Sequence, residues 1–393
     1  MNILIFQQSM GVGGVNVVSA TLARKFIEEG HQVDVFAFFK GRDDMPKESY
    51  ESIPVHIGYG FKVNRQNTTL VRNLIKERGI ELIINQWGLP YVPTATLKKA
   101  CKGTDTKWIS YYHSNPLFNG RIQEVVIALS GQKSLIKCML LRLKLAIAKT
   151  ITGRMMRHNY HECWRFMVLS EAYIENFHKF TGLRHTEKLR VMTNPITVDS
   201  SGYSFSQDNK EKEIIFVGRL DPISKKVSRL VAAWSFIEAQ CQGWRLTIVG
   251  DGPERGTIED LISKYGLKRV GIEGFKPPRP YYERASVLAM TSDFEGWPLV
   301  LGECMTFGVV PVVYDSFEAL HDIVDNGVNG IIVPKEDGKF SARIMAESLL
   351  LVIDDKEYRE KMMRQAIVKS RDFSIEGIYA KWEAVFKELS DGK

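Results

Sequence analysis

Short apolar runs typical of buried strands alternate with amphipathic stretches typical of helices along this 393-residue chain. Residues 2–7 form the first run, which leads through the glycine-rich loop GVGGVN at 11–16 into a helical pattern that ends at Gly30. The alternation continues through 31–39, 70–79, 81–88 and 107–114. Strands that alternate with helices predict a parallel sheet with helices on both faces.

The same pattern starts again after a polar, turn-rich segment at 200–212, which we interpret as a linker. EIIFVGRL at 213–220 predicts a new first strand, and WRLTIVGDGPE at 244–254 predicts a second one. The chain is also longer than one ordinary domain. We therefore expect three parts: a Rossmann-like domain over 1–200, a second Rossmann-like domain over 201–372, and a helix over 373–393 that packs back on the first domain. Two such doubly wound α/β domains facing each other would form a cleft suited to a ligand.

Composition narrows the range of partners. The formal charge of +7 favours phosphates, nucleic acid or an anionic membrane surface. The five cysteines are scattered without a CxxC pair, so we expect no disulfide framework, no structural zinc site and a reducing compartment. We find no secretory signal pattern, no apolar run long enough to cross a membrane, and no aromatic-basic RNA motif.

A basic segment at 119–160 stands apart from the alternation. It is apolar at helical spacing and has almost no acid. Its cations include Lys133, Lys137, Arg142, Lys144, Lys149, Arg154 and Arg157. A packed helix pair with a solvated basic face has this pattern, and so has an interfacial helix on anionic lipid or a basic approach to an acceptor. The sequence leaves these interpretations open.

The glycine loop at 11–16 is a candidate anion site. Glycines let the backbone approach a ligand closely, and a helix start offers amides to a phosphate. A dinucleotide-binding G-x-G-x-x-G motif would have a third glycine where this chain has Asn16. It would also have an acid at the end of the second strand, where this chain has Phe39 and Lys40. These departures disfavour a dinucleotide-dependent enzyme.

Three cations follow the first strand of the second half. Arg219 comes just beyond that strand, and Lys225 and Lys226 come near the start of the next helix. A guanidinium and an ammonium at a strand end, above a helix N-terminus, would hold a diphosphate from two sides. Solvated surface cations are the alternative. A rigid Gly-Phe loop with two prolines at 271–278 would place backbone groups against a flat base.

The stretch TSDFEGWPLVLGE at 291–303 holds two carboxylates in an apolar setting. The pattern predicts a buried strand, a turn and then a helix with Pro298 in its first turn. Glu295 would lie before that helix and Glu303 inside it, where carboxylates accept hydrogen bonds from hydroxyl groups. The helix amides at 298–300, except at Pro298, which has no amide hydrogen, would bind a phosphate or polarise a leaving group. A capping acid followed by an exposed helical acid is the alternative.

Together these motifs resemble the retaining glycosyltransferases of family 4, which have the GT-B fold of two facing Rossmann-like domains. The matching segments are GVGGVN, YYHSNP, VMTNPI, FVGRLDPISKKV, IVGDGPE, GFKPPRPYYERA and TSDFEGWPLVLGECMTFGVVPVV. The last contains the E-x7-E signature of that family. The resemblance runs through nearly the whole chain, in order.

The resemblance implies a role for each candidate residue. Glu303 would bind the nucleotide ribose and Glu295 the donor sugar, while Arg219 and either Lys225 or Lys226 would hold the diphosphate. The implied catalytic set is Arg219, Lys225, Glu295 and His113, with His113 beside the sugar. The implied donor-binding set is Gly13, Gly14, Gly218, Lys226, Phe275, Lys276, Trp297, Pro298, Leu299, Val300 and Glu303. Relatives often have smaller residues where Trp297 and Pro298 stand, so the sugar pocket departs from theirs at this point.

The implied reaction moves a hexose or N-acetylhexosamine from a nucleotide-diphosphate sugar, with UDP favoured, to a glycan hydroxyl with retention of configuration. The acceptor would be a glycan or lipid-linked glycan of lipopolysaccharide, capsule or another surface polysaccharide. The protein would then be cytoplasmic, with peripheral contact to the inner face of the plasma membrane through 119–160. We expect no metal or other cofactor and no nucleic-acid partner. The alternatives are a non-catalytic nucleotide-sugar or nucleotide-binding protein and a dinucleotide-dependent enzyme.

Overall fold

The structure is a computed structural model, and it describes residues 1–11, 13–41, 50–117, 119–130 and 132–392. The chain forms two compact units. The first unit is Met1–Pro195 with Ile375–Lys393, and the second unit is Ile196–Ser374. The division therefore falls slightly before the expected linker, and the last helix is part of the first unit.

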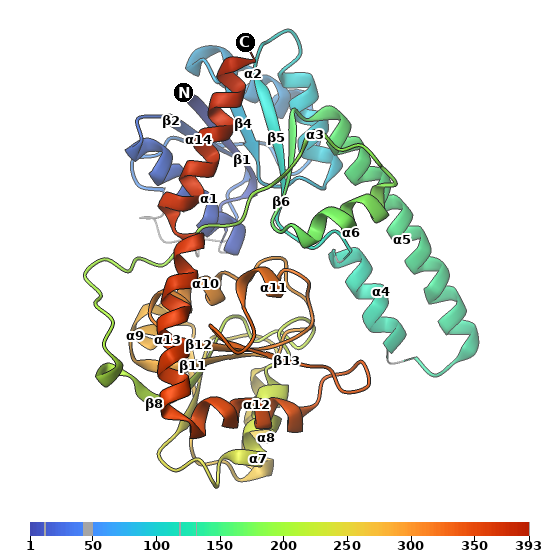
Figure 1. Cartoon of the computed structure of the whole chain (residues 1–393). Coiled ribbons are helices and arrows are strands. Elements are labelled where there is room, and N and C mark those ends of the chain that lie inside the picture. The colour runs from blue at the N-terminus through green and yellow to red at the C-terminus, as the bar shows by residue number, and fades with distance from the viewer. Residues whose placement is uncertain (12, 42–49, 118, 131, 393) are drawn as a thin grey trace. The chain divides into compact units, whose positions relative to one another are not determined.

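A seven-stranded sheet with the order β3-β2-β1-β4-β5-β6-β7 forms the centre of the first unit (Figure 1). Its strands are β1 (Asn2–Ser9), β2 (Gln32–Phe39), β3 (Val55–Ile57), β4 (Leu82–Asn85), β5 (Lys107–Tyr112), β6 (Arg165–Val168) and β7 (Leu189–Val191). Its helices are α1 (Gly14–Glu28), α2 (Arg65–Arg78), α3 (Tyr91–Ala100), α4 (Gly120–Ser130), α5 (Leu135–Glu162), α6 (Ala172–Thr181) and α14 (Ile375–Asp391). The strand order reverses between β1 and β4, and doubly wound sheets bind ligands at such a point.

Two groups of helices cover this sheet. Leu4 and Phe6 of β1 lie in one core with apolar residues of α2 and α3. Phe26 of α1 packs on Trp382 and Phe386 of α14, with ring centroids 5.6 and 5.3 Å apart. Trp382 is fully buried. The last helix of the chain thus completes the core of the first unit.

A six-stranded sheet with the order β10-β9-β8-β11-β12-β13 forms the centre of the second unit. Its strands are β8 (Glu211–Val217), β9 (Arg245–Val249), β10 (Val270–Gly274), β11 (Ala285–Met290), β12 (Val310–Tyr314) and β13 (Ile331–Val333). Its helices are α7 (Ser228–Ile237), α8 (Arg255–Tyr265), α9 (Arg279–Arg284), α10 (Leu299–Thr306), α11 (Leu320–Ile323), α12 (Ala342–Asp354) and α13 (Lys356–Ser370). Here the strand order reverses between β8 and β11.

All strand pairs within these two sheets are parallel, which confirms the predicted doubly wound α/β architecture. The carboxyl ends of parallel strands meet at one edge of a sheet, and each unit gathers its candidate residues there. Outside this pattern, α4 and α5 pack side by side, and their far ends run beyond the sheet of the first unit (Figure 1). Among the described residues, we find no helix whose length and apolar character would let it cross a membrane.

Candidate functional site

Two loops interlock at the carboxyl edge of the second sheet. The amide of Gly218 donates to Val249 O at 3.0 Å, and that of Leu220 donates to Asp251 O at 2.9 Å. A Cβ atom at Gly250 would lie 1.8 Å from Gly218 O. Only glycine permits so close an approach of the two chains. The motifs FVGRL and IVGDGPE are therefore one structural feature, formed by the ends of β8 and β9.

The acid of the second motif, Glu254, fixes the start of α7. Its buried carboxylate accepts hydrogen bonds from the amides of Val227 at 2.9 Å and Ser228 at 3.0 Å. The open helix start that we expected near the cations after β8 is therefore capped by a side chain of the same unit. A diphosphate would meet the side chains of this loop, not these two helix amides.

The two lysines after β8 pair with different acids after β11. Lys225 Nζ lies 2.5 Å from Glu295 Oε1, and both side chains are largely buried. Lys226 Nζ lies 2.9 Å from Asp293 Oδ2, and Asp293 also pairs with Arg229. Because β8 and β11 are neighbours, the two pairs bridge the point where the strand order reverses. The structure thus places Lys225, and not Lys226, beside the carboxylate expected to bind the sugar.

Other predicted residues lie along the same edge. Arg219 follows Gly218 directly after β8, and its side chain is exposed. Phe275 follows β10 and is 81% exposed, which is unusual for a phenylalanine. Lys276 next to it pairs with Glu273 at 2.5 Å, and this carboxylate raises the pKa of the lysine. The edge therefore presents an exposed guanidinium and an exposed aromatic ring on either side of the β9 loop.

The start of α10 differs from the prediction in one respect. Pro298 was expected in the first helical turn, but it precedes the helix with an extended ψ of 104°, and α10 begins at Leu299. Trp297 is buried, and its ring packs on Phe373 at 5.3 Å between centroids. Leu299 and Val300 are half-buried in the first turn, where backbone amides have no acceptor within the helix. The indole therefore supports the loop from within the unit.

Glu303 lies within α10 and is almost completely buried. Its Oε1 accepts a hydrogen bond from Thr197 Oγ1 at 2.5 Å, and its Oε2 accepts one from Tyr282 Oη at 3.1 Å. Burial raises the pKa of this carboxyl, while the two hydroxyl donors partly oppose that rise. The carboxylate thus already binds hydroxyl groups, supplied here by the protein.

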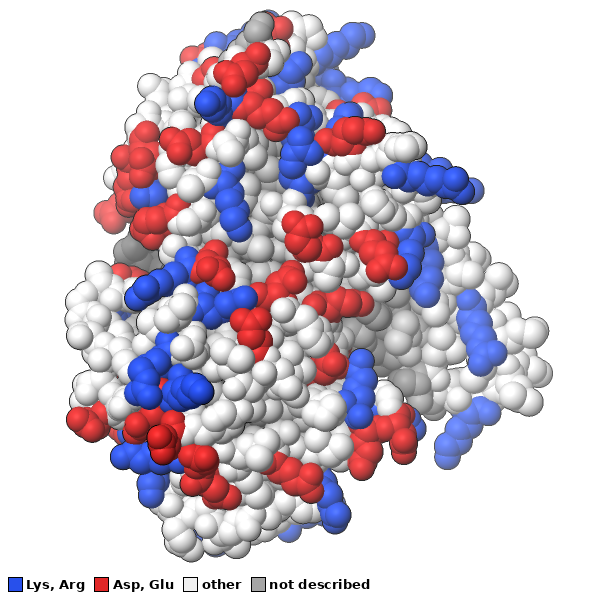
Figure 2. All heavy atoms as spheres, viewed as in Figure 1, with Lys and Arg blue, Asp and Glu red and all other residues white. Residues whose placement is uncertain are grey.

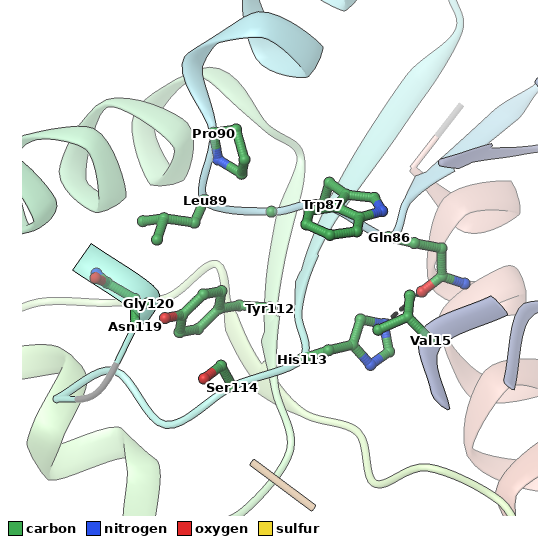
Figure 3. A pocket seen from close by; sticks show the side chains of 11 residues that line it. Val15, Gln86, Trp87, Leu89, Pro90, Tyr112, His113, Ser114, Asn119 and Gly120 are labelled. Atoms are coloured by element: carbon green, nitrogen blue, oxygen red, sulfur yellow. Dashed lines mark hydrogen bonds between the residues drawn. The ribbon is translucent and has the colours of Figure 1, made fainter. Parts of the chain in front are cut away.

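The first unit has a cavity of about 340 Å³ at the carboxyl edge of its own sheet (Figure 3). It lies where the strand order reverses, beyond β4 and β5. Its lining residues are Val15, Gln86, Trp87, Gly88, Leu89, Pro90, Tyr112, His113, Ser114, Asn119 and Gly120. Asn159 of α5 fastens one wall by donating to the carbonyls of Gly88 and Leu89 at 2.7 and 2.6 Å.

Gln86 and His113 form a polar pair in the lining of this cavity. His113 Nε2 lies 2.5 Å from Gln86 Oε1, as the dashed line in Figure 3 marks. Burial lowers the pKa of His113 to about 3, so the ring is neutral at pH 7. Among the described residues, no hydrogen-bond partner is found for Gln86 Nε2 or Trp87 Nε1, and the protein encloses both nitrogens. Because these nitrogens have almost no exposed surface, a ligand in the cavity would reach them only after the side chains moved.

The glycine loop of the first unit leads into α1. Gly13 and Gly14 are exposed where the helix begins, while Val12 lies outside the described residues. Asn16, which stands where a dinucleotide motif would have its third glycine, is buried and donates to Gly11 O. A buried amide side chain holds the loop here, a further departure from the dinucleotide motif.

Two protein-family models match the chain in tandem. The model of Glycosyltransferase Family 4 matches residues 12–200, and that of Glycosyl transferases group 1 matches residues 203–369. The chain belongs to glycosyltransferase family 4. Its two sheets are accordingly the two Rossmann-like domains of the GT-B fold.

The individual relatives have low sequence identity to this family 4 chain. An α-1,4-N-acetyl-D-galactosaminyltransferase of Campylobacter jejuni, named for a GalNAc-α-(1->4)-GalNAc-α-(1->3)-diNAcBac-PP-undecaprenol substrate, is 26% identical over 53% of the chain and 57% of its own length. The amylovoran biosynthesis glycosyltransferase AmsD of Erwinia amylovora is 29% identical over 45% of the chain and 48% of its own length. The chain thus spans about half the length of these curated relatives. Anabaena Alr3699/HepE in complex with UDP shares the fold, with a TM-score of 0.76 and 18% identity over 99% of this chain and 100% of that one.

Sequence reasoning missed several residues around these sites. Asp293 and Arg229 were not predicted, nor were Gln86, Trp87 and Asn119 of the cavity. The available signal for Gln86 and Trp87 was their position, because they directly follow the strand predicted in ELIINQWG, as His113 follows the strand predicted in KWISYYHS. Among the described residues, no three His, Cys, Asp or Glu side chains gather as a metal site would need.

Proposed function

We propose that this protein is a retaining glycosyltransferase that moves a hexose or N-acetylhexosamine from a UDP-sugar to a hydroxyl group of a glycan. The observation that carries the proposal is the Lys225–Glu295 pair, which joins a cation for the diphosphate to a carboxylate for the sugar. The pair lies where the strand order of the second sheet reverses. Family membership and the UDP bound in Anabaena HepE support this choice of donor.

The donor would lie along the carboxyl edge of the second sheet. The exposed ring of Phe275 would stack on the uracil, and Glu303 would accept a hydrogen bond from a ribose hydroxyl in place of Thr197. Arg219 and Lys225 would hold the diphosphate, and Glu295 would then bind a hydroxyl of the sugar. The first-turn amides at Leu299 and Val300 would face the same phosphates.

The chemical step breaks the bond between the anomeric carbon and the diphosphate oxygen, and the electron pair leaves with that oxygen. Arg219 and Lys225 would stabilise the negative charge that develops there, so we propose that no metal ion takes part. The acceptor hydroxyl attacks the same face of the sugar and gives its proton to the departing phosphate oxygen. His113 of the first unit, whose buried ring is neutral at pH 7, would take part as an uncharged hydrogen-bonding group.

The acceptor would be a glycan of a surface polysaccharide or lipopolysaccharide, free or linked to a lipid. The cavity beside His113 supports this, because its lining combines apolar side chains with the polar side chains of Ser114 and Asn119, as a sugar ring requires. The named substrate of the Campylobacter relative is lipid-linked. Such an acceptor would bring the protein to the inner face of the plasma membrane.

A panel of nucleotide sugars tests this function. Purified protein should slowly hydrolyse one UDP-sugar in the absence of acceptor, with UDP as the measured product, and EDTA should leave that rate unchanged. The proton spectrum of the sugar in the transferred product should show the anomeric configuration of the donor. Binding of UDP without hydrolysis of any donor would favour a non-catalytic nucleotide-sugar binder, and loss of activity in EDTA would contradict the metal-independent step.

A further inference from the structure

The first half of α5 carries an exposed apolar stripe. Leu135, Ile136, Met139, Leu140, Leu143 and Ile147 are between 51% and 87% exposed. These side chains recur at the spacing of one helical face, since a helix has about 3.6 residues per turn. Scattered exposed leucines are ordinary, but a contiguous row of six is not.

The stripe lies on the outer side of the helix. Cys138, Leu141 and Leu145 are partly buried and Ala148 is buried, and they mark the packed side of α5. At about 100° per residue, that side is opposite to the stripe. Both sides of this part of α5 are therefore apolar, but only one packs against the described part of the chain.

Cations flank the stripe on both sides. Lys137 and Lys144 lie two turns apart on one flank, and Arg142 and Lys149 lie two turns apart on the other. All four are exposed, and none has an ion-pair partner among the described residues. In Figure 2, the surface of the projecting helices α4 and α5 is white with separate blue Lys and Arg side chains. An apolar row between two basic rows matches a membrane surface, with acyl chains below and anionic headgroups around them.

A second copy of the chain fits this surface poorly. No Asp or Glu occurs between Glu124 and Glu162, so two such faces in contact would bring like charges together. An anionic bilayer supplies the opposite charge. The long, flexible stems of the lysines also let their charges reach the headgroups while the apolar row inserts.

We propose that the outer face of α5, from Leu135 to Ile147 with its flanking cations, docks the protein on an anionic lipid bilayer. The helix lies in the interface and does not span it. This docking stands whether or not the transferase activity proposed above is correct, because it depends on a surface remote from the donor residues in sequence.

Flotation with lipid vesicles tests the proposal. The full-length protein should float with phosphatidylglycerol vesicles at low salt and remain at the bottom with phosphatidylcholine vesicles. The double variant Leu140→Glu, Leu143→Glu should bind phosphatidylglycerol at least about a hundredfold more weakly, because two leucines that would insert into the bilayer are replaced by charges that the membrane repels. Phe236→Glu with Leu351→Glu is the matched control, since both residues are exposed apolar side chains of the second unit, and it should bind as the wild type does.

A second set of variants tests the charge. Replacement of Lys137, Arg142, Lys144 and Lys149 by Gln should weaken binding to phosphatidylglycerol at least about tenfold. The control replaces four exposed lysines elsewhere by Gln, namely Lys264, Lys268, Lys335 and Lys339. Failure of the wild type to float, or equal binding by stripe variant and control, would overturn the proposal. Light scattering that shows a dimer which Leu140→Glu, Leu143→Glu dissociates would assign the stripe to a second copy instead.

Discussion

Lys225 and Lys226 are adjacent in sequence but have different surroundings. Lys225 pairs with Glu295, the carboxylate proposed to bind the sugar, whereas Lys226 pairs with Asp293, which also has Arg229 as a partner. Sequence reasoning left both lysines as candidates for the diphosphate, because their spacing from Arg219 does not show which acid each one meets.

We expect Lys225→Ala to lower kcat/KM for the donor by about a hundredfold, the scale of a lost charge-assisted contact to a developing charge. Lys226→Ala should have an effect of less than about tenfold, because Arg229 remains to neutralise Asp293. Steady-state kinetics with the donor found in the panel measures both. Lys225→Arg should recover part of the loss, and the reverse ranking of the two alanine variants would contradict the assignment.

The buried carboxyl of Glu303 predicts a pH dependence of stability. Its folded-state pKa is raised above the ordinary value of 4.5. The folded state thus binds this proton more tightly than the unfolded state does, and the stabilisation is present at low pH and is lost as pH rises through the folded pKa. Glu303→Gln, which does not ionise, should therefore gain stability relative to the wild type between pH 4 and pH 7.

Urea unfolding of Glu303→Gln and of the wild type at both pH values measures this difference. Glu259→Gln, on the protein surface, is the control, and its stability relative to the wild type should change little between the two pH values. A Glu303→Gln variant that loses stability relative to the wild type at the higher pH would mean that the buried carboxylate is stabilised in its ionised form.

At the level of elements, α7 and the loop before it depend on an acid from another strand end. Glu254 accepts two hydrogen bonds from the first amides of α7. We expect Glu254→Ala to lower the free energy of unfolding by about 2 kcal/mol, as the loss of a buried cap does. It should also weaken UDP binding, because the loop that carries Lys225 leads directly into this helix.

Glu259→Ala provides the matched control on α8. Its exposed ion pair with Arg255 should contribute less than about 0.5 kcal/mol. Urea unfolding and UDP titration of the two variants make the comparison. Equal effects of the two substitutions would show that the buried cap is unimportant.

Periodicity predicted the elements well but not the contacts between them. The strand, turn and helix at 291–303 could be read locally, because apolar spacing and Pro298 act over a few residues. The capping of α7 by Glu254 could not, since it depends on β8 and β9 lying side by side. The burial of Trp297 against Phe373 and the sharing of Asp293 by two cations depend on the same long-range packing.

At the level of the whole molecule, the chain ends by returning to the unit in which it began. Trp382 of α14 packs against Phe26 and lies near Tyr111, at 6.1 Å between ring centroids. We expect Trp382→Ala to destabilise the first unit by about 3–5 kcal/mol, the range for removal of a buried tryptophan. Lys381→Ala, at an exposed neighbour, should change stability by less than about 0.5 kcal/mol.

Chemical unfolding of these two variants measures the difference. A comparable, small effect of both would show that α14 is a peripheral addition. The ring of Tyr111 lies near Trp382 and also contacts His113, with a centroid distance of 4.0 Å to His113. A small effect of Trp382→Ala would therefore also mean that the cavity beside His113 does not depend on the last helix.

Calorimetric titration with UDP tests whether the carboxyl edge of the second sheet binds the donor diphosphate. We expect the wild type to bind UDP, Arg219→Ala to bind it about 10–100-fold more weakly, and Lys264→Ala, at an exposed lysine on α8, to bind it as the wild type does. Equal UDP affinity of the wild type and Arg219→Ala, or no binding by the wild type, would show that this edge of the sheet is not the donor site.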